Sequence, residues 1–88
     1  MKRARPPVHP GEILKEEFLV PLGLSANRLA KETGLDVTCV AAITRGDRGI
    51  TAKTALALAD YFKVSPEFWM NLQTRYDLEV EKSKLVSA

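Results

Sequence analysis

Hydrophobic residues recur along this chain with the spacing of amphipathic helices. The first third carries an apolar residue at every fourth position, namely Leu14, Phe18 and Leu22. Such a stripe predicts a helix that begins at Pro10, because proline suits the first helical position, where its missing N–H has no partner to lose. We expect Pro21 and Gly23 to end this helix.

Two short helices are predicted between residues 25 and 46. Ser25 is a good N-cap for the first and Asp36 for the second, because their side chains can accept hydrogen bonds from unpaired backbone N–H groups. Gly34 and Gly46 can end them. Their core-facing positions are apolar or small: Leu29, Ala30, Val40 and Ile43. Two short helices joined by a tight, glycine-containing turn predict a helix-turn-helix.

Two further helices complete the pattern. Thr51 is expected to cap the fourth, whose apolar stripe consists of Ala52, Ala55, Leu56, Ala59 and Phe62, with Leu58 and Tyr61 on the other side. Ser65 and Pro66 are a strong start for the fifth, whose stripe is Phe68, Leu72, Tyr76 and Val80, with Trp69 beside it. No strand pattern competes, so we predict an all-α, five-helix domain.

The length of 88 residues, 45% of them hydrophobic, suits one small domain. We divide the chain into a flexible N-terminal arm over residues 1–8, basic through Lys2, Arg3 and Arg5, a domain over 9–82 and a tail over 83–88. A domain this small has a thin margin of stability, which favours a homodimer. The predicted dimer contacts lie on the last helix: Trp69, Leu72, Tyr76 and Leu78.

The third predicted helix has an unusual outward face. Once its core positions are removed, the side chains that remain are Val37, Thr38, Ala41, Ala42 and Arg45, with Cys39 at the margin. Short side chains let a helix enter the major groove of DNA deeply, where methyl groups can contact thymine. Polar and basic residues at the edges of the unit are expected to bind phosphates: Asn27, Arg28, Arg48 and Lys53. The alternative is that Ala41 and Ala42 pack against another helix.

The sequence gives little support for catalysis, metal binding, a disulfide or a membrane span. His9, the only histidine, lies beside a proline and is expected to be a helix-cap or turn residue rather than a catalytic base. Cys39 has no Cys or His at ligand spacing, so we predict no metal site, no cofactor and no disulfide. Glu16 and Glu17 are adjacent and therefore diverge on a helix. No apolar run is long enough to cross a bilayer, and we expect a cytoplasmic protein that is not an enzyme.

A family resemblance rests on several segments. The helix-turn-helix resembles the lambda-repressor-like (XRE) class through Ser25-Ala-Asn-Arg-Leu-Ala-Lys-Glu-Thr-Gly34 and Ile43-Thr-Arg-Gly46. The flanking segments are similar to those of HigA-type antitoxins: His9-Pro-Gly-Glu-Ile-Leu14, Arg48-Gly-Ile-Thr51, Pro66-Glu-Phe-Trp-Met-Asn-Leu-Gln73 and Tyr76-Asp-Leu78. The similarity spans nearly all of residues 9 to 80.

This resemblance implies a bacterial antitoxin that neutralises a HigB-type, messenger-RNA-cleaving toxin. It also implies a homodimer that represses its own operon at a palindromic operator. The residues that read DNA in the family correspond to Val37, Thr38, Cys39, Ala42 and Arg45. Two alternatives stay open: a stand-alone repressor without a toxin, and a toxin-binding module whose helix-turn-helix no longer binds DNA.

Overall fold

The structure is a computed structural model that describes residues 6–87, with side chains up to Leu85. Three segments run into one another as a single N-terminal helix: α1 (Pro10–Ile13), the π-helical η1 (Leu14–Leu19) and α2 (Val20–Leu22). They are followed by α3 (Ala26–Thr33), α4 (Val37–Thr44), α5 (Ala52–Phe62) and α6 (Pro66–Ser87). The described part of the chain contains no strand, so the prediction of an all-α, five-helix domain is confirmed.

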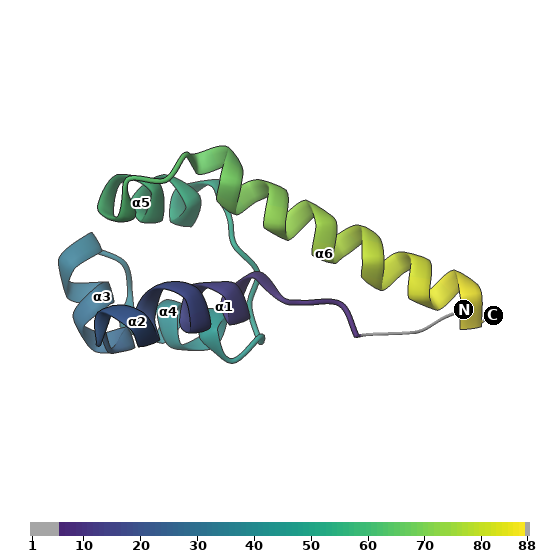
Figure 1. Ribbon diagram of the computed structural model, residues 1–88, viewed down its shortest axis with the longest axis horizontal. Coiled ribbons are helices and arrows are strands. Elements are labelled where there is room, and N and C mark those ends of the chain that lie inside the picture. Colours follow the sequence, from purple (N-terminus) through teal and green to yellow (C-terminus); the bar gives the residue numbers. More distant parts are fainter. Residues whose placement is uncertain (1–5, 88) are drawn as a thin grey trace.

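The molecule is elongated, with extents of 43 × 22 × 21 Å, because the second half of α6 projects beyond the other helices (Figure 1). This helix continues to Ser87 and so includes most of the segment predicted as a tail. Pro6 to His9 have no regular structure. The basic arm residues Lys2, Arg3 and Arg5 lie outside the described residues.

Side-chain caps begin the helices at the predicted residues. The Ser25 hydroxyl accepts a hydrogen bond from the N–H of Arg28 at 3.0 Å, and the Asp36 carboxylate accepts one from the N–H of Thr38 at 2.9 Å. Equivalent caps are formed at α1, α5 and α6 by His9, Thr51 and Ser65. A cap depends on a residue and its next few neighbours, which explains why the sequence predicted all of these starts.

The N-terminal helix differs from the prediction in its register. Pro21 does not end it, because the chain remains helical to Leu22 and stops at Gly23, which has a left-handed φ of 65°. The turn before Pro21 is π-helical, and the N–H of Val20 bonds to the carbonyl of Lys15 five residues earlier. A proline inside a helix crowds the carbonyl four residues before it, and a wider turn relieves that crowding.

This wider turn changes which residues enter the core. The apolar stripe was expected to advance by four residues at a time, but Leu19, five residues after Leu14, is the next one buried. Phe18 is half-buried, and Leu22 is 61% exposed. The predicted position of Leu22 in the core is therefore wrong, and the extra residue in the π-turn is the reason.

Apolar residues on both sides of α5 predict a helix that is covered on both sides, but the structure buries only part of each side. Ala52 is exposed and Leu56 has 59% of its surface exposed, whereas Thr54, Ala55 and Leu58 are buried. Apolar residues occur all round this helix, so their spacing does not say which side faces inward. The decision depends on packing against α3 and α6.

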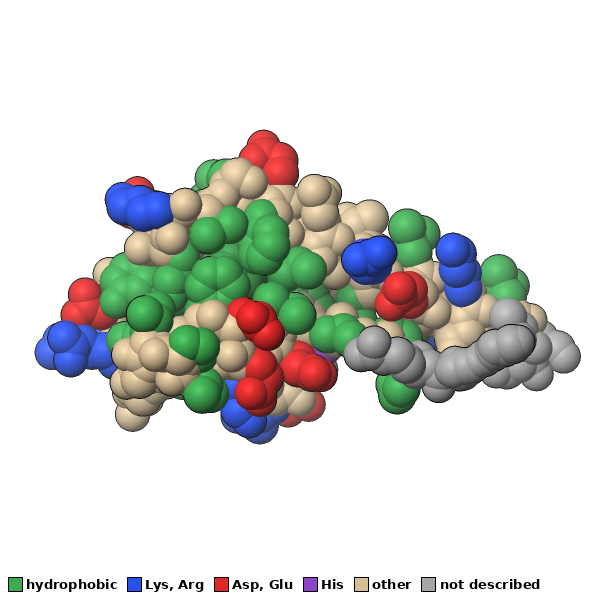
Figure 2. Space-filling model, viewed as in Figure 1, with side chains coloured by type: hydrophobic (Ala, Val, Ile, Leu, Met, Phe, Trp, Pro, Cys, Tyr) green, Lys and Arg blue, Asp and Glu red, His purple; other side chains and the backbone are tan. Residues whose placement is uncertain are grey.

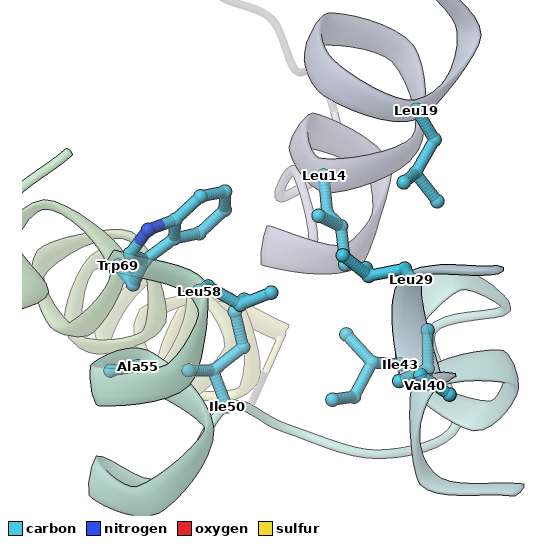
Figure 3. Packing of buried hydrophobic residues seen from close by; sticks show 10 residues of the cluster. Leu14, Leu19, Leu29, Val40, Ile43, Ile50, Ala55, Leu58 and Trp69 are labelled. Carbon is cyan, nitrogen blue, oxygen red and sulfur yellow. The ribbon is translucent and has the colours of Figure 1, made fainter. Parts of the chain in front are cut away.

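Trp69 lies in the middle of the core. Figure 3 shows its ring with leucine and isoleucine side chains from the N-terminal helix, α3, α4 and α5. The rings of Phe18 and Phe68 pack against it at centroid distances of 4.9 and 5.1 Å, and its indole N–H has no hydrogen-bond partner among the described residues. With 0% of its surface exposed, Trp69 cannot touch a second subunit. The prediction that it is a dimer contact is wrong, because the subunit's own aromatic residues cover it.

Candidate nucleic-acid interface

The helix-turn-helix consists of α3 and α4, which pack closely against each other. Ala30 is buried where the two helices cross, and Gly34 adopts a φ of 79° in the turn between them. Val40 and Ile43 are buried and fix α4 onto the core. These four predicted roles are confirmed, and together they determine which side of α4 faces outward.

The outward side of α4 carries the side chains that the sequence predicts to read DNA. Val37, with 40% of its surface exposed, and Thr38 lie on the surface at the start of α4, and Arg45 is exposed just after its end. Between them Cys39, Ala41 and Ala42 are half-buried and keep part of their surface open. This face therefore carries short side chains that are rich in methyl groups, and such side chains let a helix enter a major groove deeply.

A hollow of about 280 Å³ lies beside the first half of α4. Its lining brings together Cys39 of α4, Arg48 of the following loop and Lys53 of α5, with Asp36 as the only carboxylate. The exposed cations on its rim and the free N–H groups at the start of α5 favour an anion such as a phosphate. Three predicted site residues from separate elements thus lie around one site.

The other predicted cations are partly neutralised. Arg45 Nε donates to the Asp47 carboxylate at 3.0 Å, and Arg28 Nε donates to that of Glu32 at 2.9 Å. Arg45 also lines a second hollow of about 280 Å³, where Glu12 and Glu16 balance the charges of Arg45 and Lys15. Because these carboxylates repel phosphate, the positive potential is stronger beside Arg48 and Lys53 than beside Arg45.

The end of α4 rests on the start of the N-terminal helix. His9 accepts a hydrogen bond from the N–H of Gly11 through Nδ1 at 2.8 Å, and its ring packs edge-on against Tyr76 at 4.8 Å. Its predicted role as a helix cap is confirmed. Burial lowers the pKa of His9, although the charges of Asp77 and Asp47 act in the opposite direction. His9 therefore connects the start of the N-terminal helix with α6.

Gln73 is a site residue that was not among the predicted ones. Its side chain lies on α6 but accepts a hydrogen bond from the N–H of Ile50 at 2.6 Å, next to Arg48 in the loop between α4 and α5. The two residues are 23 positions apart, so no local pattern could reveal the contact. The sequence pointed to Gln73 only because this residue ends the segment 66–73, which resembles HigA-type antitoxins.

The remaining predicted residues differ in how far they are exposed on the surface. Asn27 and Lys53 are exposed. On α6, Leu78 has 57% of its surface exposed, whereas Leu72 and Tyr76 are half-buried against their own subunit. Within the described range 6–87, no group of three or more His, Cys, Asp or Glu side chains could hold a metal ion, and no helix is both long and apolar enough to span a membrane.

The fold and the exposed face of α4 define a helix-turn-helix protein of the DNA-binding class. A family model described as helix-turn-helix matches residues 14–69. The chain is 49% identical to virulence-associated protein I of Dichelobacter nodosus, over 90% of this chain and 73% of that protein.

Solved structures narrow the class further. An addiction module antidote protein of the HigA family from Coxiella burnetii is 49% identical with a TM-score of 0.86, over 91% of this chain and 87% of that one. The Pseudomonas aeruginosa antitoxin HigA, solved with the higBA promoter, is 42% identical with a TM-score of 0.87, over 89% and 85%. The chain belongs to the HigA family of helix-turn-helix antitoxins. These are DNA-binding regulators and not enzymes, in agreement with the sequence prediction.

Proposed function

We propose that this protein is a cytoplasmic antitoxin that represses its own operon and neutralises a HigB-type toxin, a messenger-RNA endonuclease. The observation that supports repression is the low, methyl-rich outward face of α4, flanked by the cationic hollow of Arg48 and Lys53. The HigA of Pseudomonas aeruginosa, which shares this fold, was solved with promoter DNA. Here α4 would enter the major groove while the hollow receives a backbone phosphate.

Operator binding is tested with a duplex that contains the chain's own promoter. Fluorescence anisotropy should show binding that is much tighter than to a scrambled duplex and that weakens steeply between about 50 and about 200 mM salt. Thr38→Ala should reduce the preference for the promoter duplex, because Thr38 is exposed at the start of α4 and is proposed to contact a base. Equal affinity for both duplexes at every salt concentration would contradict the proposal. Absence of binding to either duplex at low salt would favour the alternative of a toxin-binding module that no longer binds DNA.

The exposed side of α6 supports the proposal of a homodimer. Leu78 and Leu85 are seven residues apart and therefore lie on the same side of the helix, with 57% and 77% of their surfaces exposed. A second copy that packs its own stripe against this one forms a two-fold interface. Such a dimer presents two copies of α4 to half-sites of a palindrome about 34 to 36 Å apart, or a multiple of that distance.

The toxin is assigned to a different face. Between α5 and the N-terminal helix, hydrophobic side chains form a continuous area with acidic side chains beside it (Figure 2). Phe18 and Phe62 contact each other there, and Leu22 is exposed. Glu17 and Glu67 are exposed and form no ion pair within the described part of the chain. A ribonuclease needs a cationic surface to hold RNA, and an apolar, acidic face complements such a surface.

Coexpression tests this assignment. The protein should rescue growth of cells that express the product of the adjoining open reading frame, and Glu17→Lys or Leu22→Lys should abolish rescue without changing promoter binding. Glu79→Lys, the same charge reversal on the projecting part of α6 and away from the side of Leu78 and Leu85, is the matched control and should rescue fully. Rescue by all three variants would contradict the assignment, and no rescue by the wild type would favour a repressor without a toxin.

A further inference from the structure

The side-chain amide of Gln73 holds the loop that carries Arg48. Gln73 Oε1 accepts from the N–H of Ile50 at 2.6 Å, and Ile50 itself is buried. A backbone N–H that is removed from water needs such a partner. The bond therefore attaches the loop between α4 and α5 to the middle of α6.

The amide is itself oriented by a second contact. Gln73 Nε2 donates to Asp77 Oδ1 at 2.9 Å, one helical turn further along α6. This bond decides which end of the amide is oxygen and which is nitrogen, so that the oxygen points to the loop. A freely rotating amide would satisfy Ile50 only part of the time.

Gly49 shows how closely the loop approaches. A Cβ atom at this position would lie 3.0 Å from Gln73 Oε1 and 3.1 Å from both Cδ and Nε2. Only a residue without a side chain lets the loop pass this close to the amide without displacing it. The hydrogen bond and the close passage are separate observations, and both place Gln73 against the residues that follow Arg48.

We propose that Gln73, oriented by Asp77, is a positioning residue for DNA binding that sets the place of the Arg48 loop at the operator backbone. Gln73 does not touch DNA in this arrangement. It acts through the loop, and so connects α6, the helix assigned to the dimer, with the cationic hollow next to α4. This inference rests on the proposed DNA-binding function.

A double-mutant cycle on promoter binding tests the inference. Gln73→Met keeps the length of the side chain and removes both hydrogen bonds, and it should weaken binding by about five- to tenfold. It should also reduce the dependence of log K on log salt by up to about 0.9, which corresponds to one phosphate contact. Because Gln73 acts through Arg48, Gln73→Met combined with Arg48→Ala should bind as Arg48→Ala does alone. If the double variant instead loses affinity by the product of the two single-variant factors, the two residues act independently and the proposal is overturned.

Controls separate positioning from folding. Glu79→Met introduces the same side chain at an exposed residue of α6 that lies away from the side of Leu78 and Leu85, and it should lose no affinity. Asp77→Asn, which can still accept from Gln73, should lose less affinity than Asp77→Ala. Hydrogen exchange of the free protein gives a readout without DNA: Gln73→Met should accelerate exchange of the Ile50 N–H while exchange within α3 stays unchanged. Unchanged exchange at Ile50 overturns the inference. Absence of specific binding by the wild type would instead refute the proposed function.

Discussion

A methyl group added at Gly11 should destabilise the protein severely. This glycine lies in the first turn of α1, where the helix crosses the end of α4. A Cβ atom there would be 1.7 Å from the carbonyl oxygen of Ile43 and 2.6 Å from its carbonyl carbon. Both are backbone atoms of a buried residue, so they cannot rotate away. An ordinary contact of about 3.4 Å requires the two helices to separate by nearly 2 Å.

The magnitude follows from two opposing effects. Alanine is a better helix former than glycine by about 1 kcal/mol, which would stabilise Gly11→Ala. Overpacking of a rigid core costs about 1 to 3 kcal/mol, occasionally more, and we expect about 3 to 4 kcal/mol here because the added methyl group meets backbone atoms. We expect a net loss of about 2 to 3 kcal/mol, which lowers Tm by about 10 to 20 °C in a domain of this size.

Thermal unfolding followed by circular dichroism measures this loss. Gly34→Ala is the matched control, because its φ of 79° is unfavourable for alanine while no atom lies within 4 Å of the added Cβ. Backbone strain alone should cost about 1 to 2 kcal/mol there. If Gly11→Ala melts at the same temperature as the wild type, or higher than Gly34→Ala, the steric reasoning is refuted.

Three further predictions concern pH, charge and assembly. Burial lowers the pKa of His9, so the unfolded chain takes up the proton at a higher pH than the folded one does. The contribution of His9 to stability should therefore be constant above pH 6.5 and decrease as the pH falls below it. His9→Asn, which can cap the helix without titrating, should reduce the change in Tm between about pH 8 and about pH 5. Arg48→Ala should weaken binding to the promoter duplex and to the scrambled duplex by similar factors. It should weaken binding more than Arg45→Ala does, because Asp47 already pairs with Arg45. Anisotropy titrations in which Arg45→Ala loses more affinity than Arg48→Ala would contradict this prediction. Leu78→Lys together with Leu85→Lys should yield monomers in sedimentation experiments with an unchanged helical content, and an intact dimer would exclude the α6 stripe.

Interactions over a few residues made much of this protein predictable from its sequence. Every predicted helix start is capped as expected, because a cap needs only a polar side chain and the next turn of backbone. The helix-turn-helix was predictable for the same reason, since its glycine turn and its buried Ala30, Val40 and Ile43 follow the period of two short helices. Once these core positions were known, the remaining residues of α4 defined its outward face.

Backbone geometry within the N-terminal helix and packing between distant segments decided the rest. The π-turn before Pro21 exchanged Leu22 for Leu19 in the core, and the choice of buried side in α5 depended on its neighbours. Trp69 became a core residue because Phe18 of the N-terminal helix and Phe62 of α5 close around it together with its own neighbour Phe68. The bond between Gln73 and Ile50 spans 23 residues. Periodicity reports which residues share a helix face, but only the folded arrangement determines what that face meets.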